Sequence, residues 1–139
     1  MRYPITIEPD TVGYMATSRD LPEFTAAGET VAETLENAIE ILETTAGIYI
    51  DERRTVPGPS NTLDGEHLVA LPLSTALKVL LSNAMIERGW RKADLARALG
   101  SAPTHIDRLL DVNHKSKLAA IEDAFAAMDR RVEVDVHAA

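Results

Sequence analysis

The sequence predicts an α+β fold, in which a small β-β-β-α-β unit at residues 1–71 precedes an all-helical unit at residues 72–139 that ends in a short strand. Three observations predict this. Apolar and polar side chains alternate near the start of the chain, as in a strand with one buried face. Later apolar residues recur at steps of three and four, as in amphipathic helices. The 139 residues, 45% of them apolar, suffice for one medium domain or two small ones.

The first unit begins with strands. Residues 3–7 alternate between apolar and polar side chains, and Pro4, which has no N–H to donate, predicts an edge strand or the start of a strand. A turn that ends at Gly13 follows, so we expect a hairpin. The further strands are expected at residues 14–18, 24–27 and 67–71.

A helix then begins after Thr30. With Glu33, this residue has the spacing of a capping box, in which two side chains satisfy free backbone N–H groups at a helix start. The helix is expected to reach about Asp51, before a surface loop at residues 53–65. Its predicted buried residues are Val31, Leu35, Ala38, Ile39, Leu42, Ala46, Tyr49 and Ile50. Its opposite side, which is either a solvated face or a surface that binds a partner, carries Glu29, Glu33, Glu36, Glu40 and Glu43.

The second unit starts with a helix expected at residues 73–88 and continues with two short helices joined by a tight turn. Within residues 91–110, apolar residues recur at helical spacing on both sides of Gly100, a residue suited to the left-handed end of a helix. Ser101 is expected to cap the second helix, and Pro103 to lie in its first turn. The residues predicted to be buried are Ala93, Leu95 or Ala96, Leu99, Ile106, Leu109 and Leu110. This pattern is typical of a helix-turn-helix, whose second helix enters the DNA major groove.

The exposed side of that second helix is the candidate DNA-reading surface, and it carries Thr104, His105, Asp107 and Arg108. Arg108 is placed to contact guanine O6 and N7, although a pair with Asp107 or with a phosphate is also open. The candidate phosphate contacts are Lys92, Arg97, Lys115 and Lys117. Two packed helices of an ordinary bundle are the alternative to a DNA-binding pair.

The chain ends with a helix expected at residues 117–128 and a strand formed by Val132, Val134 and Val136. A single strand has no partner within a helical unit, so it is expected to pair with the first unit or with a second copy. Since one helix reads only a few base pairs, a homodimer on palindromic double-stranded DNA is the economical arrangement.

The formal net charge of −8 is distributed unevenly. Residues 1–71 contain four Arg against 13 Asp and Glu, a net charge of −9, whereas residues 72–139 contain 10 basic and nine acidic residues. Within residues 88–117, seven basic residues outnumber three acidic ones, which is a local charge suited to phosphate. The two units therefore suit different partners.

Composition argues against several kinds of site. The chain has no Cys, which excludes disulfides and thiolate metal sites, and its four His lack the spacing of metal ligands, so no metal or other cofactor is expected. The start shows no signal-peptide pattern, and no apolar run approaches the roughly 20 residues of a membrane span. We expect a cytoplasmic protein with no membrane partner.

Several motifs follow one another over the whole chain: MRYPITI, GYM, DLPE, GETVAETLENAIEIL, VALPLS and the helix-turn-helix. In this order they resemble the HicB family of antitoxins of type II toxin–antitoxin systems. The resemblance implies a first domain like a partial RNase H fold, which binds and occludes HicA, a small basic toxin that cleaves mRNA. It also implies a Cro/repressor-type helix-turn-helix domain that binds the operator of the operon as an autorepressor.

The charge distribution agrees with this resemblance. A toxin that cleaves RNA must hold phosphate and should be basic, so an acidic first unit complements it. The candidate toxin contacts are Asp20, Glu23, Glu29, Glu33 and Glu36. The main alternative is a stand-alone Cro/repressor-like transcriptional regulator whose first domain senses a ligand or only dimerises.

No enzymatic activity is expected. RNase H chemistry needs several carboxylates clustered around two Mg²⁺ ions. Asp10, Asp20 and Asp51 are available, but Asp10 lies in a turn signal and Asp51 near a helix end. Nothing in the pattern requires these residues to converge.

Overall fold

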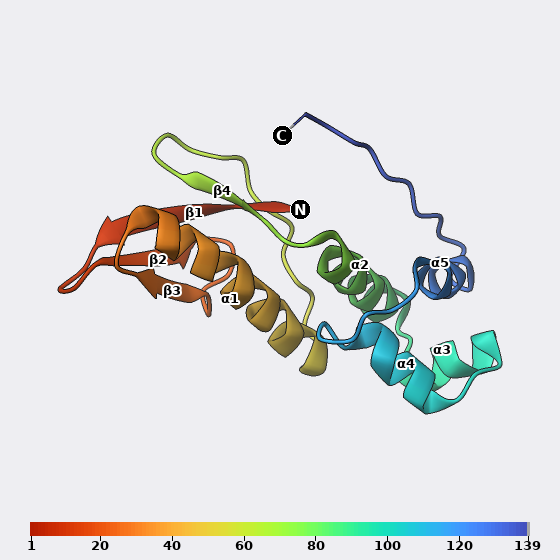
Figure 1. The fold of residues 1–139 in the computed structure, drawn as a ribbon. Helices are drawn as coiled ribbons and strands as arrows, with labels where there is room; N and C mark the ends of the chain where they lie inside the picture. Colours follow the sequence, from red (N-terminus) through yellow and green to blue (C-terminus); the bar gives the residue numbers. More distant parts are fainter. Residues whose placement is uncertain (139) are drawn as a thin grey trace.

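The computed structural model describes residues 1–138 and has the predicted α+β architecture (Figure 1). Its strands are β1 (Arg2–Pro9), β2 (Tyr14–Ser18), β3 (Thr25–Gly28) and β4 (His67–Ala70). Its helices are α1 (Val31–Asp51), α2 (Leu73–Arg88), α3 (Lys92–Leu99), α4 (Pro103–Leu110) and α5 (Leu118–Ala126). The helix α1 covers one face of the sheet, and α2 to α5 gather beyond the end of α1 (Figure 1).

The strands are antiparallel and lie in the order β3-β2-β1-β4. The edge position considered for the first strand is therefore wrong, because β1 lies between β2 and β4. Pro4 is tolerated near the start of this strand because β2 pairs with β1 only from Ile5 onward, which leaves Pro4 with a single partner, Leu68 of β4. One face of the sheet carries the buried residues Tyr3, Ile5, Ala16, Ala26 and Val69, whereas Pro4, also buried, lies on the opposite face.

The helix α1 begins after Thr30 and ends at Asp51, as predicted. Thr30 Oγ1 accepts the N–H of Glu33 at 3.1 Å. Among the described residues no return bond runs from the Glu33 carboxylate, so half of the predicted capping box forms. Gly28 lets the helix approach β3 closely, since a Cβ at this position would lie 2.6 Å from the backbone nitrogen of Thr34.

The buried side of α1 differs in part from the prediction. Val31 and Ile39 are 36% and 40% exposed, although both were expected in the core. Thr34 and Thr45 are buried instead. Burial of these hydroxyls is possible because each donates a hydrogen bond of 2.7 Å to the carbonyl oxygen four residues earlier.

The helical half follows the predicted pattern up to its last element. Gly89 and Gly100 end α2 and α3 in the left-handed conformation, with φ angles of 73° and 62°. The predicted terminal strand is wrong for the single chain: up to residue 138, no strand follows α5, and residues 130–138 extend without a neighbouring strand (Figure 1). A strand needs a partner for its backbone N–H and C=O groups, and none lies beside this segment.

The loop at residues 53–65 joins the two halves, whereas its composition predicts only a surface loop. Val56 is 2% exposed, and its N–H and C=O both bond to the side-chain amide of Asn83 in α2, at 2.9 and 3.1 Å. Arg53 donates to the carbonyl oxygen of Trp90 at 3.0 Å. Buried apolar residues therefore continue from the sheet into the helical half, and a domain boundary at residue 71 stays a prediction.

Candidate functional site

The helices α3 and α4 form the predicted pair, joined at Gly100. Its buried residues are Leu95, Ala96, Ile106, Leu109 and Leu110. Two details differ from the prediction. Ala102, not Ser101, precedes α4 as its N-cap, and Ser101 Oγ is buried without a hydrogen-bond partner among the described residues. Ala93, expected in the core, is exposed.

Some predicted DNA contacts are already engaged by acidic neighbours. Lys92 Nζ lies 2.8 Å from Asp107 Oδ1, an ion pair that ties the start of α3 to α4. Arg97 pairs with Asp94 of its own helix at 3.3 Å. The carboxylate of Asp107 thus meets Lys92 rather than its neighbour Arg108.

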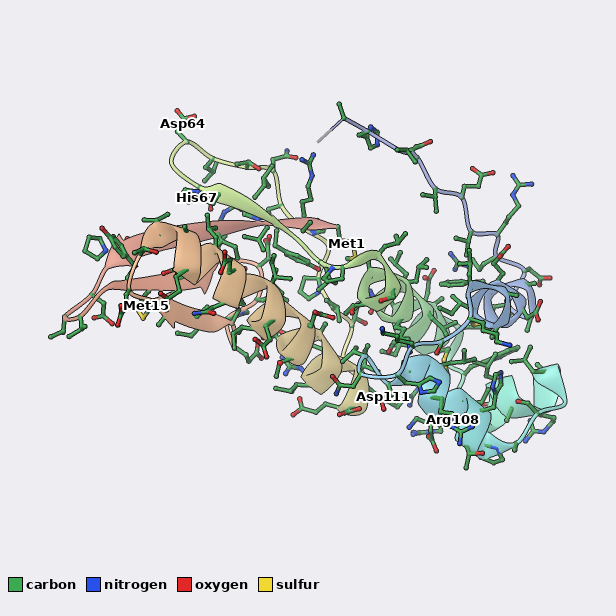
Figure 2. The ribbon with its side chains drawn as sticks, viewed as in Figure 1. Met1, Met15, Asp64, His67, Arg108 and Asp111 are labelled. Carbon is green, nitrogen blue, oxygen red and sulfur yellow. The ribbon has the colours of Figure 1, made fainter. Side chains whose placement is uncertain are left out.

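Other predicted DNA contacts are available to a partner. Arg108, Lys115 and Lys117 are exposed, and none of them forms an ion pair in the part of the chain that the structure describes. Arg108 projects from α4 (Figure 2). The two lysines follow in the loop after α4. Thr104 is exposed on the same helix, and His105 is half-buried. Each of these three exposed cations can hold a phosphate oxygen or a base edge.

Two of the predicted toxin contacts hold the first half together. The carboxylate of Asp20 accepts the backbone N–H of Ser60 at 2.9 Å and the hydroxyl of the same residue. Glu23 accepts the hydroxyl of Tyr49 and pairs with Arg54 at 2.7 Å. These two contacts, the tyrosine bond first, lower the pKa of Glu23 to about 2. Both acids therefore have intramolecular roles that their sequence positions do not reveal.

The other three predicted toxin contacts lie at the start of α1. Glu29, Glu33 and Glu36 are exposed, and none has an ion-pair partner within residues 1–138. We call these three residues the acidic patch. Unbalanced carboxylates on a rigid helix attract a cationic surface over a distance of several ångströms.

A groove of about 730 Å³ lies between the second half of α1 and α4. Its charged lining residues are Glu40, Glu43, Asp51, Lys92, Asp107 and Asp111. The carboxylates outnumber the lysine, whose charge Asp107 already balances. The groove therefore repels phosphate. The sequence shows the acids of α1, but only the fold places them opposite α4.

Lys78 of α2 is a functional candidate that the sequence analysis missed. It is 1% exposed, and its ammonium group bonds to the end of α4 and to the loop that follows. A signal for it exists in the sequence: the polar residues Thr75, Lys78 and Ser82 recur at steps of three and four, the spacing of one helix face, and all three are buried.

The described residues give no sign of a metal centre or of a membrane span. Asp10 lies in the β1–β2 turn, Asp20 is bound to Ser60, and Asp51 ends α1. Within residues 1–138 no three His, Asp or Glu side chains are grouped so as to hold a metal ion. No helix in that range combines the length and the hydropathy needed to cross a bilayer.

Comparison with known proteins identifies the family. Residues 2–80 match the model of a HicB-like antitoxin of bacterial toxin–antitoxin systems. The chain is 37% identical to Antitoxin HicB of Pseudomonas fluorescens over 99% of its own length and 94% of that protein. It is 36% identical to Antitoxin HicB of Escherichia coli K12 over 96% of its own length and 98% of the relative.

A third relative, Antitoxin HicB 2 of Photorhabdus laumondii, is 37% identical over 96% of the chain and 95% of that protein. The family model covers more than half of the chain, and these relatives match it almost from end to end. The chain therefore belongs to the HicB-like antitoxin family of bacterial toxin–antitoxin systems.

Proposed function

We propose that this protein inhibits a HicA-like mRNA-cleaving toxin with its acidic first half, and represses its own operon by binding operator DNA with α3 and α4. The observation that carries the proposal is the combination, in one member of an antitoxin family, of a half with a net charge of −9 and a helix-turn-helix with free cations. Each half supplies the charge that its proposed partner lacks. The protein acts without enzymatic chemistry of its own, in the cytoplasm.

The acidic patch is the proposed first contact with the toxin. An enzyme that cleaves RNA must bind phosphate and therefore presents cations. Glu29, Glu33 and Glu36 have no competing intramolecular cation among the described residues, so they are available to those cations. Asp20 and Glu23 act indirectly, because they hold the loop and the β2–β3 turn against α1.

The free cations beside α4 are the proposed operator contacts. Arg108 is the candidate for base contact, and Lys115 and Lys117 are candidates for phosphate contact. A helix of eight residues reads only a few base pairs, so two copies are needed for a longer site. After Val132, which packs against the core, residues 133–138 have no strand beside them and are available to pair with the same residues of a second copy, which supports a homodimer.

A stand-alone repressor accounts for the helix-turn-helix alone. It leaves unexplained the net charge of −9 of the first half. The relatives named as antitoxins match both halves of the chain, which favours the toxin-binding proposal.

The proposal requires that a small basic protein is encoded beside this gene, and co-expression with that protein is the test. We expect the full chain to restore growth that the neighbour arrests, and to co-purify with it. A mobility-shift assay on the promoter duplex of the gene, repeated over a series of salt concentrations, tests the second activity. Absence of growth rescue and co-purification contradicts toxin inhibition, and affinity no greater than for an unrelated duplex contradicts operator recognition.

A further inference from the structure

The buried ammonium group of Lys78 lies at the junction of α2, α4 and the loop after α4. Its side chain is 1% exposed. Four oxygen atoms surround Nζ: the carbonyl oxygens of Arg108 at 3.0 Å, Asp111 at 2.7 Å and His114 at 2.7 Å, and Ser116 Oγ at 2.9 Å. Figure 2 labels two of these residues, Arg108 and Asp111, at the end of α4.

These oxygen atoms differ in how far they depend on Lys78. The carbonyl oxygens of Arg108 and Asp111 also accept the backbone N–H groups of Asp111 at 3.3 Å and His114 at 3.0 Å, whereas among the described residues the carbonyl oxygen of His114 has the lysine as its donor. The last carbonyl groups of a helix have no partner within the helix, and they carry the negative end of its dipole. The carbonyl of Arg108 belongs to this last turn of α4, and the other three oxygens belong to the irregular loop that follows. One buried cation attracts all four oxygens, and its three N–H donors suffice because the carbonyl oxygen of Arg108, the most distant of the four, also accepts from the N–H of Asp111 and the hydroxyl of Ser116.

We propose that Lys78 is the positioning residue of the DNA-binding unit: it fixes the end of α4 and residues 111–116 so that Arg108, Lys115 and Lys117 face DNA together. The inference rests on the proposed operator binding. Lys78 does not touch DNA itself, because its side chain is almost wholly enclosed. It acts through the backbone that carries the contacting side chains.

Packing alone does not require a charge at this position. A methionine side chain has a similar length and fills a similar volume, but it offers no N–H donor to the oxygen atoms. Ser116 compensates little, since its hydroxyl already donates to the carbonyl oxygen of Arg108 at 3.3 Å. Burial lowers the pKa of Lys78, and the carboxylate of Asp111 opposes that shift.

The first test uses the full-length variant Lys78→Met and the promoter duplex of the gene. We expect the affinity for the duplex to fall roughly tenfold or more, because the carbonyl oxygen of His114 loses its donor and Ser116 Oγ loses the ammonium group that holds it. The dependence of affinity on salt should keep its slope, since no phosphate contact is removed. Lys117→Ala is the matched control, because it removes a lysine that is a proposed phosphate contact. It should lower that slope by about one.

The second test separates positioning from general loss of structure. Lys78→Ala retains Cβ and lacks the remainder of the side chain, which propylammonium replaces. We expect added propylammonium to restore duplex affinity and to slow amide exchange at residues 109–116, while propanol, of the same length and uncharged, does neither. If the variant is unfolded without the amine, refolding by propylammonium and not by propanol is the expected result.

Three outcomes would overturn the assignment of Lys78 as a positioning residue. An affinity of Lys78→Met within twofold of wild type, or a salt slope that falls by about one, overturns the proposal. Equal effects of propylammonium and propanol overturn it too. If the wild-type chain binds no duplex, the proposed operator binding is wrong, while amide exchange at residues 109–116 in Lys78→Met still decides whether Lys78 fixes this segment.

Discussion

Residues 1–71 and residues 72–139 contain 17 and 19 charged side chains, yet these charges are arranged differently. In the first half 13 acids share four arginines, so most carboxylates lack an arginine of the same half whatever the fold, and the fold leaves those of the acidic patch among them. In the second half the numbers of basic and acidic residues are nearly equal, and many of them form ion pairs, such as Lys92 with Asp107 and Arg97 with Asp94. Net charge therefore predicts the sign of a partner only where one sign is in large excess.

The difference assigns separate roles to the two surfaces. In the proposed function, the acidic half attracts a cationic partner through many equivalent carboxylates, whereas the helix-turn-helix half depends on a few cations in fixed positions. Loss of one carboxylate should then matter little, and loss of one free cation should matter more.

The largest expected effects come from the cores beneath the two surfaces. Leu95 of α3 and Leu42 of α1 are 0% and 1% exposed. We expect Leu95→Ala and Leu42→Ala each to lower the free energy of unfolding by about 2–5 kcal/mol, measured by urea titration. Under conditions where both variants stay folded, Leu95→Ala should weaken duplex binding more than toxin binding, and Leu42→Ala the reverse. Equal loss of both activities in each variant contradicts the separation of the two surfaces.

A smaller effect is expected from the cations of the helix-turn-helix. We expect Arg108→Ala to weaken binding to the promoter duplex by about 1–3 kcal/mol, because a free guanidinium suits a bidentate base contact. Arg97→Ala is the matched control and should cost less, since Asp94 already engages Arg97. Toxin capture should be unchanged in both variants. If the two variants weaken duplex binding equally, an intramolecular ion pair does not decide which cations are available to DNA.

A third effect concerns the rate of toxin binding. The triple variant Glu29→Gln, Glu33→Gln, Glu36→Gln should slow association with the toxin by roughly tenfold at low salt, because steering depends on the net field of the surface. Stopped-flow mixing at several salt concentrations measures this change, which should shrink as salt screens the field. Glu23→Gln is the control, since its carboxylate already serves Tyr49 and Arg54. A rate for Glu23→Gln as slow as that of the triple variant contradicts the assignment of the acidic patch.

The ends of the helices could be predicted from the sequence because they depend on a few neighbouring residues. Thr30 and Gly100 mark helix limits through capping and through left-handed backbone, and the structure confirms both. Strand order depends on contacts between distant segments. The position of β1 inside the sheet follows from its pairing with β4, which no local pattern near Pro4 indicates.

The candidate site was predictable as a set of exposed charges but not as a set of contacts. The sequence shows that residues 20 and 23 are acidic. Only the fold shows that Asp20 accepts a hydrogen bond from Ser60 and Glu23 one from Tyr49. The same holds for Lys78, whose four oxygen partners come from another helix and its loop. Long-range partners decide whether a charged residue supports the fold or is available to a ligand.

The smallest expected effect is the contribution of Glu23 to stability at low pH. The pKa of Glu23 is lowered to about 2, first by the hydroxyl of Tyr49 and then by Arg54. A carboxyl whose pKa is lower in the folded state stabilises that state above its ordinary pKa, and this stabilisation is lost as the pH falls toward 2. In Glu23→Gln the free energy of unfolding should therefore fall less steeply with acid over this window than in wild type. Tyr49→Phe should flatten the dependence in part, since Arg54 remains, and an acid dependence identical to wild type in both variants would show that this carboxylate does not join the β2–β3 turn to α1.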